Sequence, residues 1–346
     1  MAYSAISKPS LHFNTKLYTG NATNPTTISG IGFQPDWVWT KLRSGGTEAH
    51  RLCDAVRGAT KDLFSNATDA EATNTIGLKS FNADGYVIGN SNGYNLNTGT
   101  FVSWNWKANG AGSANTDGSI NTTATSVNTT AGFSISKYTG TGSNATVGHG
   151  LGVAPNMVLV KSLSGGGDWT SYHSVLGNTK YMRLNSNIAA GTQSSYWNDT
   201  SPTSTVFSIG TAGDVNSNGT TYIAYCFAEK KGFSKFGSYT GNGSADGTFI
   251  YTGFKPAWVM TKASSAAGQS WHMQDNKRDG FNYDNKRLFA ESSSSESSTS
   301  RMDLLSNGFK YRDGDGNGSG ITYIYLAFAE QPLVANVGAS IPATAR

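Results

Sequence analysis

The sequence predicts an all-β protein built from three tandem β-sandwich repeats of about 100 residues each. Charged residues make up only 14% of the 346 residues, glycine occurs 42 times and aromatic residues reach 12%. Low charge, many glycines and many β-forming residues are typical of all-β proteins with many turns. No stretch of useful length shows the 3.6-residue apolar period of a helix. A segment that occurs three times predicts the number of repeats.

Each copy of this segment has a glycine and a proline that end a loop, followed by a β-rich run that ends at a lysine. Glycine and proline punctuate loops, and the run after the proline alternates as a strand does. A Tyr-Thr-Gly tripeptide precedes each copy. The three copies are residues 32–41, 152–161 and 253–262.

A second apolar run closes each repeat, at residues 101–106, 222–227 and 323–328. The motif lysine and the closing aromatic are 65 residues apart in the first copy and 66 in the other two. Such near-equal spacing is the signature of a repeat protein. We therefore expect repeat one at residues 1–107 with an N-terminal arm at 1–9, a linker at 108–118, repeat two at 119–229, repeat three at 230–332 and a C-terminal tail at 333–346.

The joins between the repeats differ in composition. Residues 108–118 are rich in Gly, Ala, Ser and Asn, which predicts a flexible linker and a hinged repeat one. The join before repeat three is short, so repeats two and three should abut rigidly. About 100 residues are enough to bury a core, so each repeat is expected to close its own sandwich. The tail is expected to be an extended or disordered end.

The strands inside each repeat follow from turn signals and alternation. In repeat one the first strand is expected to start near Leu11, and Asp84-Gly85 before an aromatic run predicts a hairpin. Phe207 and Phe309 stand where Tyr86 stands in repeat one. Alternation in Trp37-Val38-Trp39 predicts strands with one buried face.

Composition excludes several classes of partner. A net charge of +4, scattered along the chain, predicts no nucleic-acid binding. No apolar run is long enough to span a membrane, and the first residues lack the pattern of a signal peptide. Cys53 and Cys226 occupy unrelated positions in different repeats, so we expect two small buried thiols and no disulfide.

The sequence predicts no enzyme activity and no catalytic residue. The five histidines neither recur at one repeat position nor form the spacing of a catalytic triad or a metal motif. Carboxylate pairs for glycoside hydrolysis are available in Asp54 with Glu71 and in Asp275 with Asp279. No motif selects either pair, so hydrolysis is a remote alternative.

No cofactor is predicted, and calcium is left open by one short string. Asp313, Asp315 and Asn317 place oxygen atoms at alternate positions and a glycine follows, as at the start of a calcium loop. The twelfth position is Ile324 where such a loop has glutamate. We favour a hairpin turn that uses Asn and Gly for positive φ, because Asn- and Gly-containing stretches stand at the equivalent places 95–99 and 214–219, and calcium is the weaker alternative.

The aromatic residues are the candidate ligand contacts. Eight tryptophans are many for a sandwich, and alternation puts Trp37 and Trp39 on one face of their strand. If that face is core, the rings are packing residues. If it is exposed, they form a platform that stacks on sugar rings or contacts another protein. The candidates for ligand contact are Trp39, Trp106, Trp258, Trp271 and Tyr311.

Several of these segments resemble a known family. Residues 32–41, 54–59, 84–86 and 104–107 are similar to an uncharacterised repeat module of tailed-phage virion proteins, frequent in marine and cyanobacterial phages. Residues 131–135, 149–152 and 222–227 look like a second form of the module. The resemblance covers nearly the whole chain. It implies a tail-fibre-like structural protein with lectin-like, jelly-roll β-sandwiches, and it assigns no functional residues.

The resemblance and the composition together predict a virion protein without enzyme activity, assembled in the host cytoplasm. The expected role is that of a tail-fibre or tail-tip adhesin for a host-surface polysaccharide or protein receptor, since repeated weak sites gain strength by avidity. Other virion proteins are expected partners, and a homo-oligomer is expected, a trimer if the protein forms a fibre. A capsid or tail decoration or connector protein without a host ligand is the first alternative. A polysaccharide depolymerase is the second.

Overall fold

The computed structural model describes residues 4–299 and 302–334, and this part of the chain is almost entirely β-structure. In it the helices α1 to α3 are single turns, and none has the length or apolarity to cross a membrane. The predicted all-β class is confirmed. The elements of repeat one are η1 (Pro9–Leu11), β1 (Phe13–Thr19), β2 (Thr26–Ser29), β3 (Trp37–Ser44), β4 (Arg51–Asp54), β5 (Lys61–Asp62), β6 (Ala72–Thr73), β7 (Leu78–Asn82), β8 (Gly85–Ile88), α1 (Asn92–Asn95) and β9 (Thr100–Trp106).

Repeat one forms two main antiparallel sheets, with the short pair β5–β6 beside them. The inner sheet has the strand order β1-β9-β3-β4, and it pairs the motif strand β3 with the closing strand β9. The outer sheet has the order β2-β8-β7. Its β7–β8 hairpin turns at Asp84 as the sequence predicts. Gly85 is required there, because a Cβ atom would lie 1.9 Å from the carbonyl oxygen of Ile28 on the neighbouring strand.

The same pairing of motif strand with closing strand recurs twice more. Trp37 pairs with Trp106 in repeat one, and Met157 pairs with Phe227 in repeat two. The elements of repeat two are β10 (Ala124–Asn128), β11 (Phe133–Thr139), β12 (Ala145–Gly148), β13 (Met157–Ser162), β14 (Thr170–His173), β15 (Lys180–Arg183), β16 (Gly191–Thr192), α2 (Ser194–Trp197), β17 (Val206–Ile209), α3 (Gly213–Asn216) and β18 (Thr221–Phe227).

Repeat three pairs Trp258 with Phe328 in the same way. Its inner sheet has the order β19-β26-β21-β22-β23, and its outer sheet has the order β20-β25-β24. Its elements are β19 (Ser234–Thr240), β20 (Phe249–Tyr251), β21 (Phe254–Ala263), β22 (His272–Asp275), β23 (Leu288–Phe289), β24 (Met302–Leu305), β25 (Gly308–Tyr311) and β26 (Thr322–Pro332).

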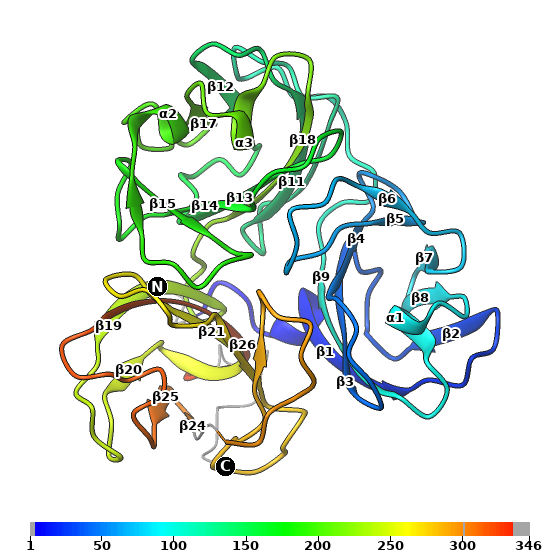
Figure 1. Cartoon of the computed structure of the whole chain (residues 1–346), viewed down its shortest axis with the longest axis vertical. Helices are drawn as coiled ribbons and strands as arrows, with labels where there is room; N and C mark the ends of the chain where they lie inside the picture. Colours follow the sequence, from blue (N-terminus) through cyan, green and yellow to red (C-terminus); the bar gives the residue numbers. More distant parts are fainter. Residues whose placement is uncertain (1–3, 300–301, 335–346) are drawn as a thin grey trace.

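The inner sheets of the three repeats face one common core. Figure 1 shows the repeats arranged around a central point, with repeat one in blue, repeat two in green and repeat three in yellow to red. One hydrophobic cluster contains Trp37, Phe227 and Trp258, one residue from each repeat. The other face of each inner sheet packs against its own outer sheet. Each repeat therefore closes its own sandwich as expected, but the expectation of strands with one buried face is wrong, because both faces of the inner sheets are buried.

Buried lysines join the repeats in a ring. Each motif lysine is fully buried, and its Nζ donates to a backbone carbonyl of the repeat that precedes its own around the ring. Burial lowers the pKa of each of these lysines to about 8. The three contacts are Lys41 to Ser293 O at 2.9 Å, Lys161 to Thr68 O at 2.9 Å and Lys262 to Ile188 O at 2.7 Å.

The chain between repeats one and two is held against repeat one. The buried carboxylate of Asp36 accepts the backbone N–H of Ala108 at 2.7 Å and that of Gly110 at 3.1 Å. Ser113 then forms a β-bridge with Thr125. The expectation of a hinge at residues 108–118 is wrong, since these contacts and the common core fix repeat one to its neighbours.

The two ends of the chain differ in what can be said of them. In the N-terminal arm, Ile6 is buried in the common core and the backbone N–H of Ala5 donates to Lys231 O at 2.9 Å. The arm is thus docked on repeat three. The prediction for the C-terminal tail falls mostly on residues 335–346, which lie outside the described residues.

Candidate functional site

The five aromatic residues predicted to contact a ligand are all inside the protein. Each has at most 2% of its surface exposed. Four belong to the common core, and Tyr311 lies in the core between the sheets of repeat three. A ring without exposed surface cannot stack on a sugar, so the prediction is wrong for Trp39, Trp106, Trp258, Trp271 and Tyr311.

The indole groups of the core serve as contacts between repeats instead. Trp271 Nε1 donates to Arg183 O of repeat two at 2.9 Å, and Trp169 Nε1 donates to Phe64 O of repeat one at 2.8 Å. His50 occupies the same place in repeat one, where its Nε2 lies 2.9 Å from Phe289 O of repeat three. These aromatic side chains position the repeats relative to one another.

The candidate calcium ligands hold a turn. Asn317 is fully buried, and its amide donates to Asn242 Oδ1 at 2.8 Å and to Ser244 O at 3.0 Å. Asp315 forms an ion pair with Arg287. Among the described residues, no group of three or more His, Cys, Asp or Glu side chains is placed to hold a metal ion. The alternative of a hairpin is wrong, because this turn joins β25 to β26 and these strands belong to the two different sheets of repeat three.

Three of the four carboxylates considered for hydrolysis lie in ion pairs, and the fourth, Asp279, accepts the backbone N–H of Asn285 at 3.0 Å. Asp54 Oδ2 is 2.5 Å from Arg57 Nε, and the same arginine reaches Glu71 at 3.2 Å. Asp275 Oδ2 is likewise 2.6 Å from Arg278 Nε. Asp54 also accepts the hydroxyl of Tyr225 from repeat two at 2.7 Å. Asp275 accepts the indole N–H of Trp104 from repeat one at 3.0 Å, so Asp54 and Asp275 both join repeats, as the core tryptophans do.

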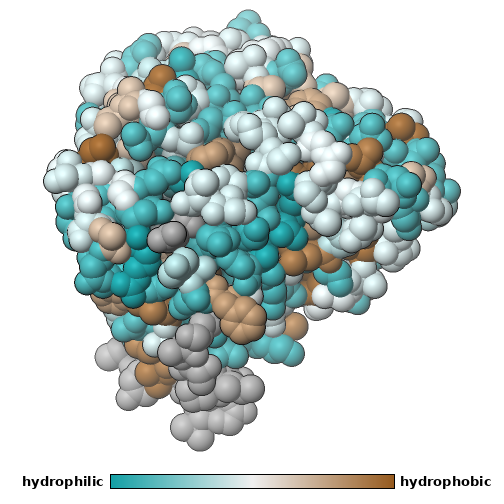
Figure 2. All heavy atoms as spheres, turned by 60° about the horizontal axis from the view of Figure 1, so that its bottom comes forward, coloured by the Kyte–Doolittle hydropathy of each residue, from teal (hydrophilic) through white to brown (hydrophobic). Residues whose placement is uncertain are grey.

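The exposed aromatic side chains lie elsewhere, on repeat three. Among the described residues, the exposed large aromatic side chains are Phe249 (44%), Tyr251 (57%), Phe281 (82%) and Tyr283 (47%). Figure 2 looks from the lower side of Figure 1, where repeat three lies, and shows apolar residues standing among hydrophilic ones. Exposed aromatic rings gathered on one side are unusual and mark contact sites.

Strand register explains why two of these rings face solvent. Ile250 packs in the core of repeat three and pairs with Phe309, so its neighbours Phe249 and Tyr251 point to the opposite face of β20. The equivalent core pairs are Ile28 with Tyr86 in repeat one and Val147 with Phe207 in repeat two. The outward residues there are Thr27 and Ser29, and Thr146 and Gly148. Repeat three thus carries two rings where the others carry small residues.

Charged side chains stand beside Phe249 on the outer face. Lys310 is the cross-strand partner of Phe249, and its Nζ lies 2.6 Å from Asp246 Oδ1. Arg312 Nη1 lies 2.6 Å from the same oxygen, and its Nε lies 2.5 Å from Asp303 Oδ2. The hydrogen bond from Lys310 is the main cause that lowers the pKa of the exposed Asp246. We call Lys310, Arg312, Asp246 and Asp303 the charged quartet.

A hollow of about 440 Å³ opens beside the charged quartet. Asn282 is held in its wall, because its amide donates to Leu304 O and its carbonyl oxygen accepts the N–H of Leu304. An aromatic ring, a fixed amide, a guanidinium and a carboxylate therefore meet in one depression. The lining residues are Ala245, Asn282, Tyr283, Asp303 and Arg312.

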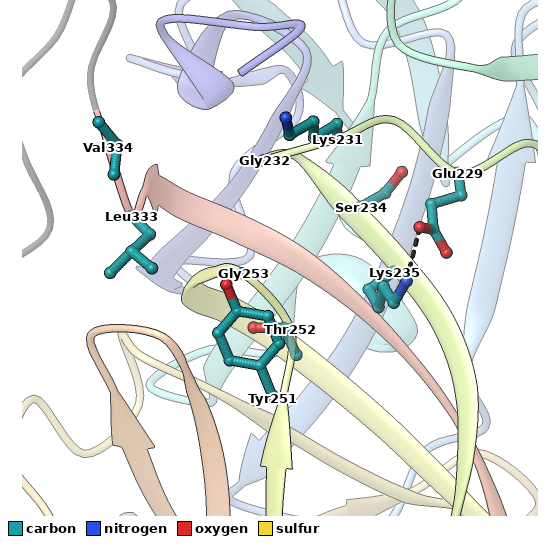
Figure 3. Close-up of a pocket in the computed structure, with 10 residues that line it drawn as sticks. All are labelled: Glu229, Lys231, Gly232, Ser234, Lys235, Tyr251, Thr252, Gly253, Leu333 and Val334. Carbon is teal, nitrogen blue, oxygen red and sulfur yellow. Dashed lines mark hydrogen bonds and ion pairs between the residues drawn. The ribbon is translucent and has the colours of Figure 1, made fainter. Parts of the chain in front are cut away.

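A second hollow of about 270 Å³ borders the same face at Tyr251. Figure 3 shows Tyr251 on one side of this hollow and the ion pair between Lys235 and Glu229 on the other. Lys235 Nζ lies 2.7 Å from Glu229 Oε1. The remaining lining residues are Lys231, Gly232, Ser234, Thr252, Gly253, Leu333 and Val334.

We call the surface of Phe249, Tyr251, Tyr283 and the charged quartet the outer face of repeat three. It combines rings that can stack with donors and acceptors that can bind hydroxyl groups. Sequence reasoning missed these residues. The signal was present, because aligning the repeats on Tyr86, Phe207 and Phe309 sets Phe249 and Tyr251 against small residues.

Comparison with known proteins identifies the family but no activity. A comparison with the curated proteins finds no match. Residues 8–332, which include all three repeats, match a family described as a domain of unknown function (DUF7483). One family thus spans the common core and the outer face together. The chain belongs to the family of this domain of unknown function.

Proposed function

We propose that the protein is a non-enzymatic adhesin of a tailed-phage virion, a tail-fibre or tail-tip component that binds host-surface polysaccharide through the outer face of repeat three. Two lines support this function. The repeated segments resemble a module of phage virion proteins, and the outer face has the chemistry of a sugar-binding surface. Protein sugar sites pair an aromatic ring, which covers the apolar face of a sugar, with polar groups that take its hydroxyls.

The observation that carries the proposal is the difference among equivalent positions. Phe249 and Tyr251 expose 44% and 57% of their surfaces where repeats one and two place small residues. Exposing these rings adds nothing to the core between the sheets of repeat three, because Ile250 between them makes the packing contact there. Their exposure is explained if a ligand covers them.

The test exchanges the rings for the residues of repeat one. In the double variant Phe249→Thr/Tyr251→Ser, we expect binding to host cells and to their purified surface polysaccharide to weaken about tenfold or more, since each ring contact contributes about 1 kcal/mol. Val153→Thr removes an equally exposed apolar side chain from repeat two and is the matched control. Unchanged binding by the double variant would rule out this face, and no binding by the wild type would rule out adhesion.

A decoration or connector role is the second candidate, and Phe281 favours it. This ring is 82% exposed, as expected for a residue that another protein covers. Antibody-gold labelling of intact virions separates the two roles. Label at the tail or its fibres supports adhesion, whereas label over the head supports decoration. Phe281→Ser should then impair incorporation into virions and leave polysaccharide binding unchanged.

The number of binding faces on each chain bears on the oligomeric state of the protein. The aromatic pair occurs on one repeat of three, so a single chain offers one such face. Avidity then requires several chains, and we expect a homo-oligomer, a trimer if the protein is a fibre. Sedimentation equilibrium of the purified protein measures this directly, and a monomer at all concentrations would contradict it.

A further inference from the structure

The outer face of repeat three is wider than one sugar ring. The outer sheet has the order β20-β25-β24, and Asp284 adds a fourth segment by exchanging two backbone hydrogen bonds with Met302, at 2.7 and 3.0 Å. Neighbouring strands lie about 4.8 Å apart, so the three steps from Phe249 on β20 to the segment at Tyr283 span roughly 14 Å. Rings therefore stand on both sides of the charged quartet.

The charged quartet carries no net charge. Lys310 and Arg312 contribute two positive charges, and Asp246 and Asp303 contribute two negative ones. Each cation contacts a carboxylate within 2.6 Å. An anionic ligand would have to displace a carboxylate from its cation, and a cationic ligand would have to displace a cation. The quartet thus disfavours charged ligands of either sign.

Hydrogen-bonding groups remain on the two most exposed members of the quartet. Both cations contact the same oxygen of Asp246, Oδ1, and this side chain is 73% exposed, so Oδ2 remains as an acceptor. Arg312 uses Nε and Nη1 for its two carboxylate partners, so among the described residues Nη2 remains as a donor. An acceptor and a donor side by side match two neighbouring hydroxyls of a sugar, since each hydroxyl both donates and accepts.

Resting on the proposed function, we infer that the ligand is an uncharged polysaccharide segment that lies across the strands of the outer sheet. One end stacks on Phe249 and Tyr251, and the other end enters the hollow beside Tyr283. The hydroxyls of the sugar between them bind Asp246 Oδ2 and Arg312 Nη2. The face therefore distinguishes ligands by length and by charge.

The length of the ligand is tested with an array of neutral oligosaccharides of increasing length. The wild type should retain oligomers of several sugars and fail to retain single sugars. Tyr283→Ala should weaken binding of the longer oligomers about fivefold, as loss of one aromatic contact of about 1 kcal/mol predicts, and bring their affinity down to that of short ones. Equal retention of single sugars and longer oligomers would overturn the inference.

The charge of the ligand is tested on the same array with uronate-containing and sulfated oligosaccharides. Asp246→Asn keeps the shape of the side chain and leaves the two cations in excess, so this variant should weaken binding of neutral glycans and gain binding of acidic ones. Asp117→Asn, an equally conservative change at an exposed carboxylate outside repeat three, should alter neither. Binding of neutral glycans by the wild type should persist at about 1 M salt, where the Debye length is about 3 Å.

The outcomes separate this inference from the proposed function. If the wild type prefers acidic glycans and Phe249→Thr/Tyr251→Ser abolishes that binding, the adhesive face stands and the inference of an uncharged ligand is overturned. If the wild type retains no glycan, both fall. If the wild type retains neutral oligomers and Tyr283→Ala weakens their binding, the result supports both the proposed function and the inference of an uncharged ligand.

Discussion

The inner faces of the three repeats are alike, whereas their outer faces differ. On the inner side, the repeats make equivalent contacts, and each motif lysine donates to a carbonyl of the repeat that precedes its own around the ring. On the outer side the repeats differ, and repeat three alone among the described strands replaces small residues by Phe249 and Tyr251. The residues that recur along the chain are therefore those that hold the repeats together.

This difference shows where to look for function in a protein with internal repeats. A position that must fit the same neighbour three times is constrained to similar chemistry, and it produces the visible sequence motif. A position that faces solvent is free of that constraint and can carry a ligand contact on a single repeat. The motif lysines and tryptophans belong to the first class, and the outer face of repeat three belongs to the second.

The largest effect is expected from a tryptophan of the common core. The ring of Trp106 lies 4.6 Å from that of Trp37, tilted by 35°, and 5.7 Å from the rings of both Trp258 and Phe328 of repeat three. Trp106→Ala removes a buried ring shared by two repeats and should lower the free energy of unfolding by roughly 4 to 5 kcal/mol. Urea unfolding monitored by fluorescence and by circular dichroism measures this. A separate transition in which repeat one unfolds by itself would contradict a single core shared by the three repeats.

A slightly smaller effect is expected from a buried ion pair that repeat two lacks. Asp54 and Arg57 are fully buried partners 2.5 Å apart, whereas His173 and Leu176 hold these places in repeat two. Arg57→Leu leaves the buried carboxylate of Asp54 without its ion-pair partner and should lower the free energy of unfolding by roughly 3 to 5 kcal/mol. The double variant Asp54→His/Arg57→Leu copies repeat two and should recover part of that loss. A double variant no better than the single one would show that the repeats are not interchangeable at this contact.

The third effect is a loss of stability in acid. The ring of His173 is buried, with Nε2 3.3 Å from Tyr325 O of repeat three, and burial lowers its pKa to about 4. Between pH 6.5 and 4 the unfolded chain binds a proton that the folded chain does not, so stability falls as the pH falls through this window. This lowering of the His173 pKa corresponds to a loss of about 3 kcal/mol in the free energy of unfolding once the pH is below both pKa values.

Comparing His173→Gln with the wild type isolates this histidine, since His50 and His272 remain in both proteins. The variant should lose less stability than the wild type when urea unfolding is repeated at pH 7 and near pH 4. Parallel losses in the two proteins would place the acid sensitivity elsewhere.

The sequence is sufficient for the class of fold and for many local elements. Glycine and proline punctuation, with alternation after it, locates the motif strands, and Asp84-Gly85 locates a hairpin. It does not show that both faces of the inner sheets are buried, although the unbroken apolar run Trp37-Val38-Trp39 is typical of such strands. Nor does it show that Asp36 holds the chain at Ala108, because that contact joins residues far apart in sequence.

The candidate site was missed for a related reason. Large aromatic rings suggest ligand contacts only when they are exposed, and exposure depends on how three sheets meet at the common core. Trp258 and Phe249 are both aromatic and nine residues apart in repeat three, yet one is 1% exposed and the other 44%. Only the position of each ring relative to the core separates them.

The smallest effect is expected for the outer face, and it completes the comparison. Phe249→Thr/Tyr251→Ser replaces exposed rings by the residues that the equivalent sheet of repeat one carries at Thr27 and Ser29. The free energy of unfolding should change by less than about 0.5 kcal/mol, because surface substitutions away from packing contacts rarely cost more. Thermal and urea unfolding of the double variant beside Trp106→Ala measure the contrast directly. A loss of 2 kcal/mol or more would mean that these rings stabilise the fold, and exposure would then no longer argue for a ligand.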